Sequence, residues 1–413
     1  MNLLNHQENK PASGGVAIVV GGGPAGLMAA WRLAGHFEVH LFEKEKMVGQ
    51  KFLLAGKGGL NITSHVEGVK LAEKYSPRGF MDTALNLFGP QQLREWLGQL
   101  GIPTYTGSSG KVFPKKGISP AQVLKAIVNS MQQRGVHIHT SHKLTDFDGQ
   151  MRFAFLNGNK QIEIQADFAV LALGGASWPG TGSDGKWTEI MNRRGITTLP
   201  FQPSNCGVNI EWPAQLRQFH EGKPLKNIMM QVQDVKSKGE ALITGYGLEG
   251  FAVYPLVPEI RKLIASGQSA ALRLDLKPTS DRDSLLKRLG NTRPGSRAYA
   301  RCLKLDAVSL ALIKAYTSQE EFLEPALFAD ALKNLLLPVH SLRGLDEAIS
   351  STGGLGLESL NPDFSLKKFP RIFVAGEMTD WDAPTGGFLL QGCFSGGFSA
   401  ANEIISRCGC QMT

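Results

Sequence analysis

Residues 16–44 of the chain read VAIVVGGGPAGLMAAWRLAGHFEVHLFEK. The unbroken apolar run at residues 16–20 is typical of a strand that is buried on both faces. Apolar residues then recur at helical spacing over residues 27–33, and a second apolar run covers residues 38–42. This order predicts a strand, a tight turn, a helix and a second strand, which is the unit that binds dinucleotides in many α/β proteins.

Three glycines, Gly21, Gly23 and Gly26, give this unit the spacing G-x-G-x-x-G. We expect Gly21 to allow the sharp turn, Gly23 to let the backbone approach a pyrophosphate, and Gly26 to let the helix pack close to the strand. The start of the helix offers free N–H groups that attract phosphate. Glu43 ends the second strand about 20 residues further on, where an acid can bind a ribose hydroxyl. The sequence therefore predicts a dinucleotide site.

The composition of the 413-residue chain is that of a globular protein, with 42% hydrophobic and 19% charged residues. This length exceeds one ordinary core, so we expect more than one domain. The sequence has no apolar run long enough for a membrane span, and residues 1–13 lack the features of a signal peptide. The five cysteines are few and scattered, which suits a reducing compartment. We therefore expect a cytoplasmic protein with a flexible tail at residues 1–13.

Buried strands of the same kind return later in the chain. Residues 166–177 read ADFAVLALGGAS and residues 371–377 read RIFVAGE, and each stretch predicts a strand that ends in glycine. Alternating runs at residues 136–155 are typical of small antiparallel strands. Short β runs at residues 201–274 are followed by helical spacing at residues 281–334. A β-rich and helical segment therefore separates the late strand from the early ones.

These patterns predict an α/β fold with one domain inserted into another. The outer, Rossmann-like domain is discontinuous and consists of residues 14–199 and residues 341–413. The inserted domain, at residues 200–340, has a barrel-like β part followed by helices.

The formal net charge of +8 is concentrated in the predicted insert. Residues 213–305 hold 16 Lys or Arg against 8 Asp or Glu, whereas the rest of the chain is balanced. Residues 287–304 contain no acid, and a helix there would place Arg297, Arg301 and Lys304 on one face. A charged face of this kind is usually only solvated, but contacts with phosphate would give it salt-sensitive affinity for nucleic acid.

A second G-x-G-x-x-G is formed by Gly180, Gly182 and Gly185. Pro179 precedes it in place of a strand, and no acid stands at the end of a following strand. The pattern therefore lacks the context that a nicotinamide-binding unit requires. If the chain uses NAD(P)H as an electron donor, we expect this donor to bind only transiently.

Taken together, the motifs resemble flavoproteins of the glutathione-reductase-like two-dinucleotide-binding class. More narrowly, GQKFLLAGKGGLNITS at residues 49–64, GEALITGYGLEG at residues 239–250 and VAGEMTDWDAPTGGFLLQGCFSGG at residues 374–397 resemble the BaiN/YhiN-like (HI0933-like) flavoprotein family. The resemblance covers nearly the whole chain and implies that the Rossmann-like domain binds FAD. Many members have Arg where this chain has Gln50, so the activities of individual relatives are not carried over.

The resemblance also implies which residues bind FAD. The glycine turn would bind the pyrophosphate, Leu144 the adenine through its backbone, and Glu377 the ribityl chain. Residues 51–61 would lie along the flavin, and residues 386–388 would cover its pyrimidine ring. The predicted cofactor-binding residues are Gly21, Gly23, Pro24, Ala25, Gly26, Glu43, Lys44, Lys51, Gly58, Asn61, Leu144, Gly174, Gly376, Glu377, Asp380, Gly386, Gly387 and Phe388.

These features predict an FAD-dependent oxidoreductase that acts on a small molecule, as an oxidase, a dehydrogenase or an NAD(P)H-linked reductase. Lys51 and Lys57 would stabilise the negative charge of reduced flavin, whereas no general base and no metal site can be named. The loop after Glu43 has no cysteine pair, which argues against a disulfide reductase. Two alternatives remain open, a flavoprotein that binds RNA through its basic insert and a flavin scaffold without catalytic activity.

Overall fold

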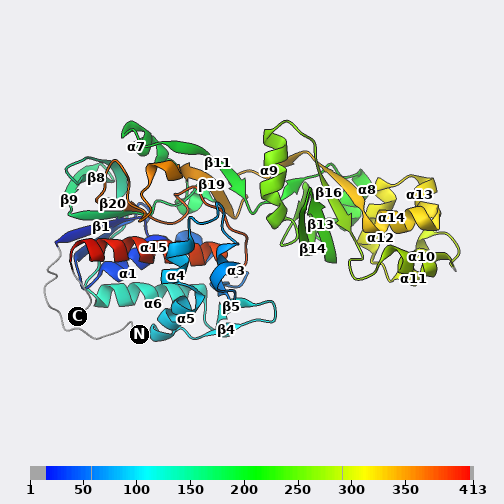
Figure 1. The fold of residues 1–413 in the computed structure, drawn as a ribbon, viewed down its shortest axis with the longest axis horizontal. Coiled ribbons are helices and arrows are strands. Elements are labelled where there is room, and N and C mark those ends of the chain that lie inside the picture. The colour runs from blue at the N-terminus through cyan, green and yellow to red at the C-terminus, as the bar shows by residue number, and fades with distance from the viewer. Residues whose placement is uncertain (1–14, 57, 291, 410–413) are drawn as a thin grey trace. The chain divides into compact units, whose positions relative to one another are not determined.

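The computed structural model describes residues 15–56, 58–290 and 292–409. The chain forms two compact units (Figure 1). Unit 1 consists of Met1–Gln202 and Ser350–Thr413, and unit 2 consists of Pro203–Ile349. Within the described ranges, each helix is too short or too polar to cross a bilayer.

Unit 1 is built on a five-stranded parallel sheet with the strand order β20-β10-β1-β2-β6. Its strands are β1 (Val16–Val20), β2 (Glu38–Phe42), β6 (His137–His139), β10 (Phe168–Leu171) and β20 (Ile372–Val374). The first strand is central, with β2 on one side and β10 on the other. Ligands of open α/β sheets bind at such a reversal of strand order, beyond the carboxyl ends of the strands.

The apolar run of β1 is unbroken because both faces of the strand are buried. Ala17 and Val19 belong to a core that includes the helices α1 (Pro24–Leu33), α6 (Pro120–Gln133) and α15 (Phe388–Arg407). Ile18 and Val20 belong to a second core, which includes the antiparallel sheet of β7 (Lys143–Phe147), β8 (Arg152–Asn157) and β9 (Lys160–Gln165). Unit 1 is therefore layered, with helices on one face of the parallel sheet and a small sheet on the other.

Short elements complete unit 1. They are α2 (Gln50–Ala55), β3 (Thr63–Ser64), α3 (Gly68–Ala72), α4 (Asp82–Leu87), α5 (Pro90–Gln99), β4 (Thr104–Thr106), β5 (Lys111–Pro114), η1 (Pro179–Thr181), α7 (Thr188–Arg193), β11 (Thr198–Ser204), β19 (Ser350–Leu355) and η3 (Leu357–Ser359).

A hydrogen-bond network fixes the first turns of α15. Thr63 Oγ1 donates to Gln391 Oε1 over 2.6 Å, and Gln391 Nε2 donates to the carbonyl oxygen of Phe88 over 2.9 Å. Ser395 Oγ donates to the same carbonyl over 2.7 Å. These side chains are buried, so the network ties the helix to β3 and to the end of α4.

Unit 2 holds a seven-stranded antiparallel sheet with the order β17-β16-β13-β14-β15-β12-β18. The two outermost strands, β17 (Leu335–Val339) and β18 (Ser341–Leu342), flank His340 and are parts of one bent segment. The sheet therefore closes on itself through this segment. The other strands are β12 (Val208–Asn209), β13 (Pro224–Val232), β14 (Val235–Thr244), β15 (Gly247–Glu249) and β16 (Ala270–Asp275).

Helices cover the sheet of unit 2 and share its hydrophobic core. They are α8 (Ala214–His220), η2 (Tyr254–Leu256), α9 (Val257–Ala265), α10 (Arg282–Gly290), α11 (Ser296–Leu303), α12 (Ala307–Tyr316), α13 (Gln319–Leu323) and α14 (Pro325–Lys333). The expected α/β fold with a β-rich and helical insert is confirmed. One local prediction is wrong, because Lys304 is the left-handed C-cap of α11 and does not continue the helical face of Arg297 and Arg301.

Two glycines of α15 offer a matched test of its packing against α1, which lies beside it (Figure 1). A Cβ atom at Gly397 would lie 2.1 Å from the carbonyl oxygen of Ala25, whereas the nearest atom to a Cβ at Gly396 is 3.7 Å away. We expect Gly397→Ala to lower the free energy of unfolding by about 1–3 kcal/mol through overpacking. Gly396→Ala should raise it by up to about 1 kcal/mol, because alanine favours the helix.

Denaturation of the cofactor-free protein, followed by circular dichroism, measures both changes. Equal stability of the two variants would contradict the close helix contact.

Candidate cofactor site

Unit 1 has a pocket at the carboxyl ends of four parallel strands, and we call it the strand-end pocket. Its wall at these strand ends consists of Val20, Gly21, Gly22, Gly23, Phe42, Glu43, Lys44, Ala172, Leu173, Gly174, Ala375, Gly376 and Glu377. Segments that are far apart in sequence thus meet at the reversal of strand order, where the fold predicts a ligand.

The structure brings most of the predicted cofactor-binding residues to this pocket. Those that line it are Gly21, Gly23, Pro24, Ala25, Glu43, Lys44, Lys51, Leu144, Gly174, Gly376 and Glu377. Those that are outside its lining are Gly26, Gly58, Asn61, Asp380, Gly386, Gly387 and Phe388. Lys57 lies outside the described residues.

The glycine turn forms the floor of the pocket. Gly21 has a φ of 108°, and a Cβ atom there would lie 2.2 Å from the carbonyl oxygen of Ala172. A Cβ at Gly26 would lie 1.9 Å from the carbonyl oxygen of Gly21, so the helix could not start so close to the strand with a larger residue. Gly23 is the N-cap of α1 and has open space around its Cα. Among the described residues, no side chain caps this helix end, which leaves its N–H groups available to an anion.

Glu43 is held at the end of β2 by backbone donors. Its Oε2 accepts from the N–H of Gly22 over 2.7 Å, and its Oε1 accepts from the N–H of Glu45 over 2.9 Å. Burial raises the pKa of Glu43 above its ordinary value, although both hydrogen bonds act in the opposite direction. Each carboxylate oxygen can accept a second hydrogen bond, so the side chain can bind ribose hydroxyls.

A lysine–glutamate pair lies at another part of the pocket. Lys51 Nζ is 2.8 Å from Glu377 Oε2 and donates to Ser177 Oγ over 2.7 Å. The lysine belongs to α2, whereas the glutamate follows β20. This pair fixes the position of the Lys51 ammonium group in the pocket wall, and Glu377 partly neutralises its charge.

Cys393 of α15 also lines the pocket. Burial first, and then the charge of Glu377, raises the pKa of its thiol well above the ordinary value. The thiol is therefore protonated at neutral pH and is a poor nucleophile.

The predicted residues outside the pocket lining mainly support the backbone around it. Asp380 Oδ1 accepts from the N–H of Gly353 over 2.7 Å and from Thr352 Oγ1 over 2.9 Å. Gly387 has a φ of 91°, and a Cβ atom there would lie 2.6 Å from the Cα of Thr63. Asn61 differs from these residues, because its buried Oδ1 has no hydrogen-bond partner among the described residues.

The second glycine-rich loop lines the same pocket, which the sequence pattern did not predict. Its pocket residues are Thr181, Gly182, Ser183 and Asp184. Lys44 Nζ lies 2.8 Å from Asp184 Oδ1, so an ion pair joins this loop to the end of β2. Burial alone would raise the pKa of Asp184, but its contacts with Lys44 hold it below the ordinary value. The glycine spacing drew attention to residues 180–185 in the sequence, but only the tertiary structure shows that residues 181–184 line this pocket.

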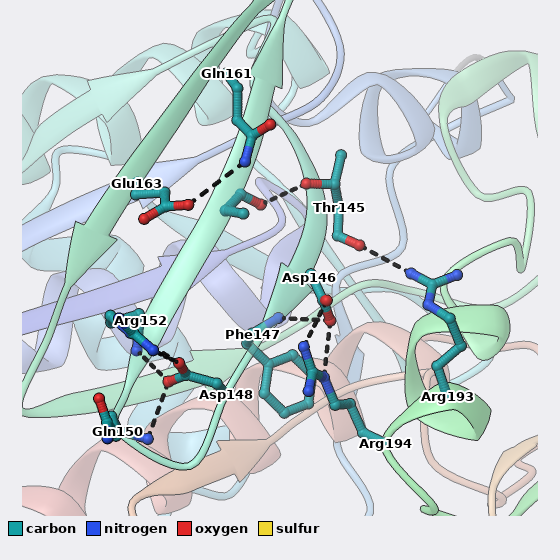
Figure 2. Close-up of polar contacts among 11 residues, drawn as sticks. Thr145, Asp146, Phe147, Asp148, Gln150, Arg152, Gln161, Glu163, Arg193 and Arg194 are labelled. Carbon is teal, nitrogen blue, oxygen red and sulfur yellow. Dashed lines mark hydrogen bonds and ion pairs between the residues drawn. The ribbon is translucent and has the colours of Figure 1, made fainter.

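The helix after this loop is clamped to β7, where Leu144 lies (Figure 2). Arg194 donates to both oxygens of Asp146, with distances of 2.8 Å from Nε and 2.5 Å from Nη2. Arg193 Nη2 donates to the carbonyl oxygen of Thr145 over 3.0 Å. Both Arg193 and Thr145 line the strand-end pocket, so the clamp holds two of its walls together.

The donor set of the pocket fits FAD. Helix N–H groups suit the pyrophosphate, the held carboxylate of Glu43 suits a ribose, and Lys51 suits an electron-rich ring. Of the residues that line the pocket, Ser183 has a buried hydroxyl that lacks a hydrogen-bond partner among the described residues. Polar atoms of this kind gain partners when a polar ligand binds.

Known proteins that are similar to this chain align with nearly its whole length. The chain is 24% identical over 412 residues to the 3-dehydro-bile acid delta(4,6)-reductase of Clostridium scindens, with 94% of this chain and 98% of that protein covered. It is 23% identical over 410 residues to the ribosomal RNA dihydrouridine synthase of Escherichia coli, with the same coverage.

Solved structures and family models complete the comparison. A 3-ketosteroid delta1-dehydrogenase from Sterolibacterium denitrificans, solved with 1,4-androstadiene-3,17-dione, has a similar fold, with a TM-score of 0.50 and 13% identity. The match covers 95% of this chain and 99% of that one. The model of the HI0933-like protein Rossmann domain matches residues 16–403. The chain therefore belongs to the HI0933-like family, as its motifs predicted.

Proposed function

We propose that this protein is an FAD-dependent oxidoreductase that holds FAD in the strand-end pocket and reduces a carbon–carbon double bond of a small molecule. The observation that carries this proposal is the joint position of the glycine turn, Glu43 and the Lys51–Glu377 pair around one pocket. Unit 1 is then the FAD-binding domain, and unit 2 is a domain inserted into it.

Each part of FAD has suitable partners in the pocket. The N-terminus of α1 binds the pyrophosphate, because its N–H groups are uncapped. Glu43 binds the adenosine ribose, and Leu144 lies beside the adenine on β7. Glu377 faces the ribityl chain. Asn61 is outside the pocket lining, and its buried Oδ1 would reach the flavin only if FAD extends beyond that lining.

Lys51 has the clearest chemical role. A bound FAD supplies two-electron redox chemistry. The ammonium group of Lys51, fixed by Ser177 and Glu377, stabilises negative charge that develops in the pocket. The protonated thiol of Cys393 takes no part in disulfide chemistry.

The names of two relatives support the reaction class. One is a reductase of the delta(4,6) bonds of a bile acid, and the other forms dihydrouridine from uridine in ribosomal RNA. Both reactions saturate a carbon–carbon double bond, although the substrates differ greatly in size. We propose the same reaction for this chain, with NADH or NADPH as a transient donor.

We also propose a cytoplasmic location, which the free thiols of Cys302 and Cys393 suit.

RNA is the second candidate substrate, because one relative acts on ribosomal RNA and unit 2 carries the excess of basic residues. The exposed residues Arg297 and Arg301 lie one helical turn apart on α11. Against RNA binding, Tyr299 of the same helix is fully buried and offers no ring to a base. The arrangement favours a solvated helix, so a small molecule remains our first proposal.

Glu43→Gln tests the cofactor assignment. We expect the dissociation constant of FAD to rise about tenfold to hundredfold, because hydrogen bonds to a carboxylate are lost. Titration of the cofactor-free protein, followed by flavin fluorescence, measures this change. Glu38→Gln on the same strand is the control, since Glu38 is exposed and outside the pocket lining. Equal affinity of the two variants would remove Glu43 from the site.

The pH dependence of FAD binding follows from the same carboxylate. Because the pKa of Glu43 is raised, the group takes up a proton at a higher pH than an ordinary glutamate. Affinity of the wild type should therefore fall as the pH decreases through this raised pKa, whereas Glu43→Gln should lack this dependence. Parallel curves for the two proteins would contradict the role of the ionised form.

Lys51→Met tests the proposed chemistry. We expect anaerobic addition of NADH or NADPH to bleach the flavin bands of the wild type, and the variant to be reduced about tenfold to hundredfold more slowly. Its flavin midpoint potential should also be more negative, because the reduced form loses a positive neighbour. Lys46→Met is the control, since Lys46 is exposed and outside the pocket lining. An unchanged potential would contradict this role for Lys51.

A filter-binding experiment separates the two candidate substrates. We expect the wild type and a double variant with Arg297→Glu and Arg301→Glu to retain a ribosomal RNA fragment equally weakly at physiological salt. Tight binding by the wild type that falls steeply with salt, and that the double variant loses, would favour RNA.

A further inference from the structure

The second glycine-rich loop, at residues 180–185, has no part in the function proposed so far. It is not a dinucleotide turn, because the 3₁₀ turn η1 precedes Gly182 where a strand would be required. Gly182 instead allows the backbone conformation and the close packing that the course of the loop requires. Gly182 has a φ of 91°, and a Cβ atom there would lie 2.9 Å from the Cγ of Glu45. The loop therefore passes close to the segment that follows Glu43.

Ser183 is the residue of this loop whose surroundings indicate that it binds a ligand. Ser183 lines the strand-end pocket, and the residue is only 7% exposed. Its buried Oγ has no hydrogen-bond partner among the described residues. A buried hydroxyl without a partner destabilises a protein, so native structures seldom retain one without a reason.

The surroundings of Ser183 indicate which part of a ligand it faces. A Cβ atom at Gly174, which follows β10, would lie 3.6 Å from Ser183 Oγ. The next residue, Asp184, is paired with Lys44, and Lys44 directly follows Glu43. Ser183 is thus tied to the side of the pocket where Glu43 lies. That side holds the ADP half of a dinucleotide.

We propose that Ser183 Oγ donates a hydrogen bond to an oxygen of the ADP half of FAD, and that the Lys44–Asp184 ion pair latches the loop over this half. The inference rests on the proposed function of the pocket. It adds Ser183 to the residues that bind FAD, and it adds an ion pair that slows the dissociation of FAD. The loop then forms a second wall of one FAD site, and not a separate nicotinamide site.

Ser183→Ala tests the hydrogen bond with two probes, FAD and ADP. Calorimetric titration of the cofactor-free variant should show that both ligands bind about threefold to tenfold more weakly. Ser237→Ala in unit 2 is the matched control, because Ser237 is 8% exposed and outside the pocket lining. Equal affinity of Ser183→Ala and wild type for both ligands would overturn the proposal, and so would a loss confined to FAD.

Thermal unfolding separates this role from a structural one. Cofactor-free Ser183→Ala should be as stable as the cofactor-free wild type or more stable, because the substitution removes an unpartnered hydroxyl. Lower stability of the cofactor-free variant would show that the hydroxyl has a structural partner and would overturn the proposal. Failure of the wild type itself to bind FAD would instead contradict the proposed function, so the two failures are distinguishable.

Dissociation kinetics test the latch. We expect Asp184→Asn and Lys44→Met each to release FAD about twofold to fivefold faster than the wild type, as for other partly exposed ion pairs. The double variant should release FAD no faster than either single variant, because both remove the same interaction. Salt should accelerate release from the wild type alone. Additive effects, or release at the wild-type rate, would overturn the latch.

Discussion

The architecture of unit 1 depends on backbone-to-backbone contact at one point, where α1 starts. A Cβ atom at Gly26 would lie 1.9 Å from the carbonyl oxygen of Gly21, and one at Gly397 would lie 2.1 Å from the carbonyl oxygen of Ala25. The central strand, α1 and α15 can therefore meet only because side chains are missing there. This closeness points the free N–H groups of α1 at the strand ends, and the rest of the pocket is arranged around them.

Ion pairs then join segments that are remote in sequence around the pocket. Lys51 meets Glu377, Lys44 meets Asp184, and Arg194 meets Asp146. All six side chains are partly exposed, so each pair stabilises the fold by at most about 1 kcal/mol. Their main effect is on geometry, because they set the positions of loops that the hydrophobic cores do not reach.

Local patterns were enough to predict the first βαβ unit, since the buried strand, the glycine spacing and Glu43 all lie within residues 16–44. Local patterns failed where tertiary contacts determine how a strand pairs or where a side chain is buried. The alternating residues of β6 indicated an antiparallel strand, yet β6 pairs with β2 in parallel at the edge of the main sheet. Likewise, nothing near Ser183 in sequence indicates that its hydroxyl is buried at the pocket. Such placements depend on segments that are far apart in the sequence.

The discontinuity of unit 1 has a consequence for biosynthesis. Residues after 349 supply β20, Glu377 and α15, and thus one side of the strand-end pocket. A ribosome delivers this segment after unit 2, because synthesis proceeds from the N-terminus, and unit 2 can fold while the segment is still being translated. The emerging chain consequently displays β1, α1 and β2 for most of its translation without the wall that completes the site. The pocket is therefore complete only after residues 372–407 have been synthesised, so the first strands fold without a complete pocket beside them.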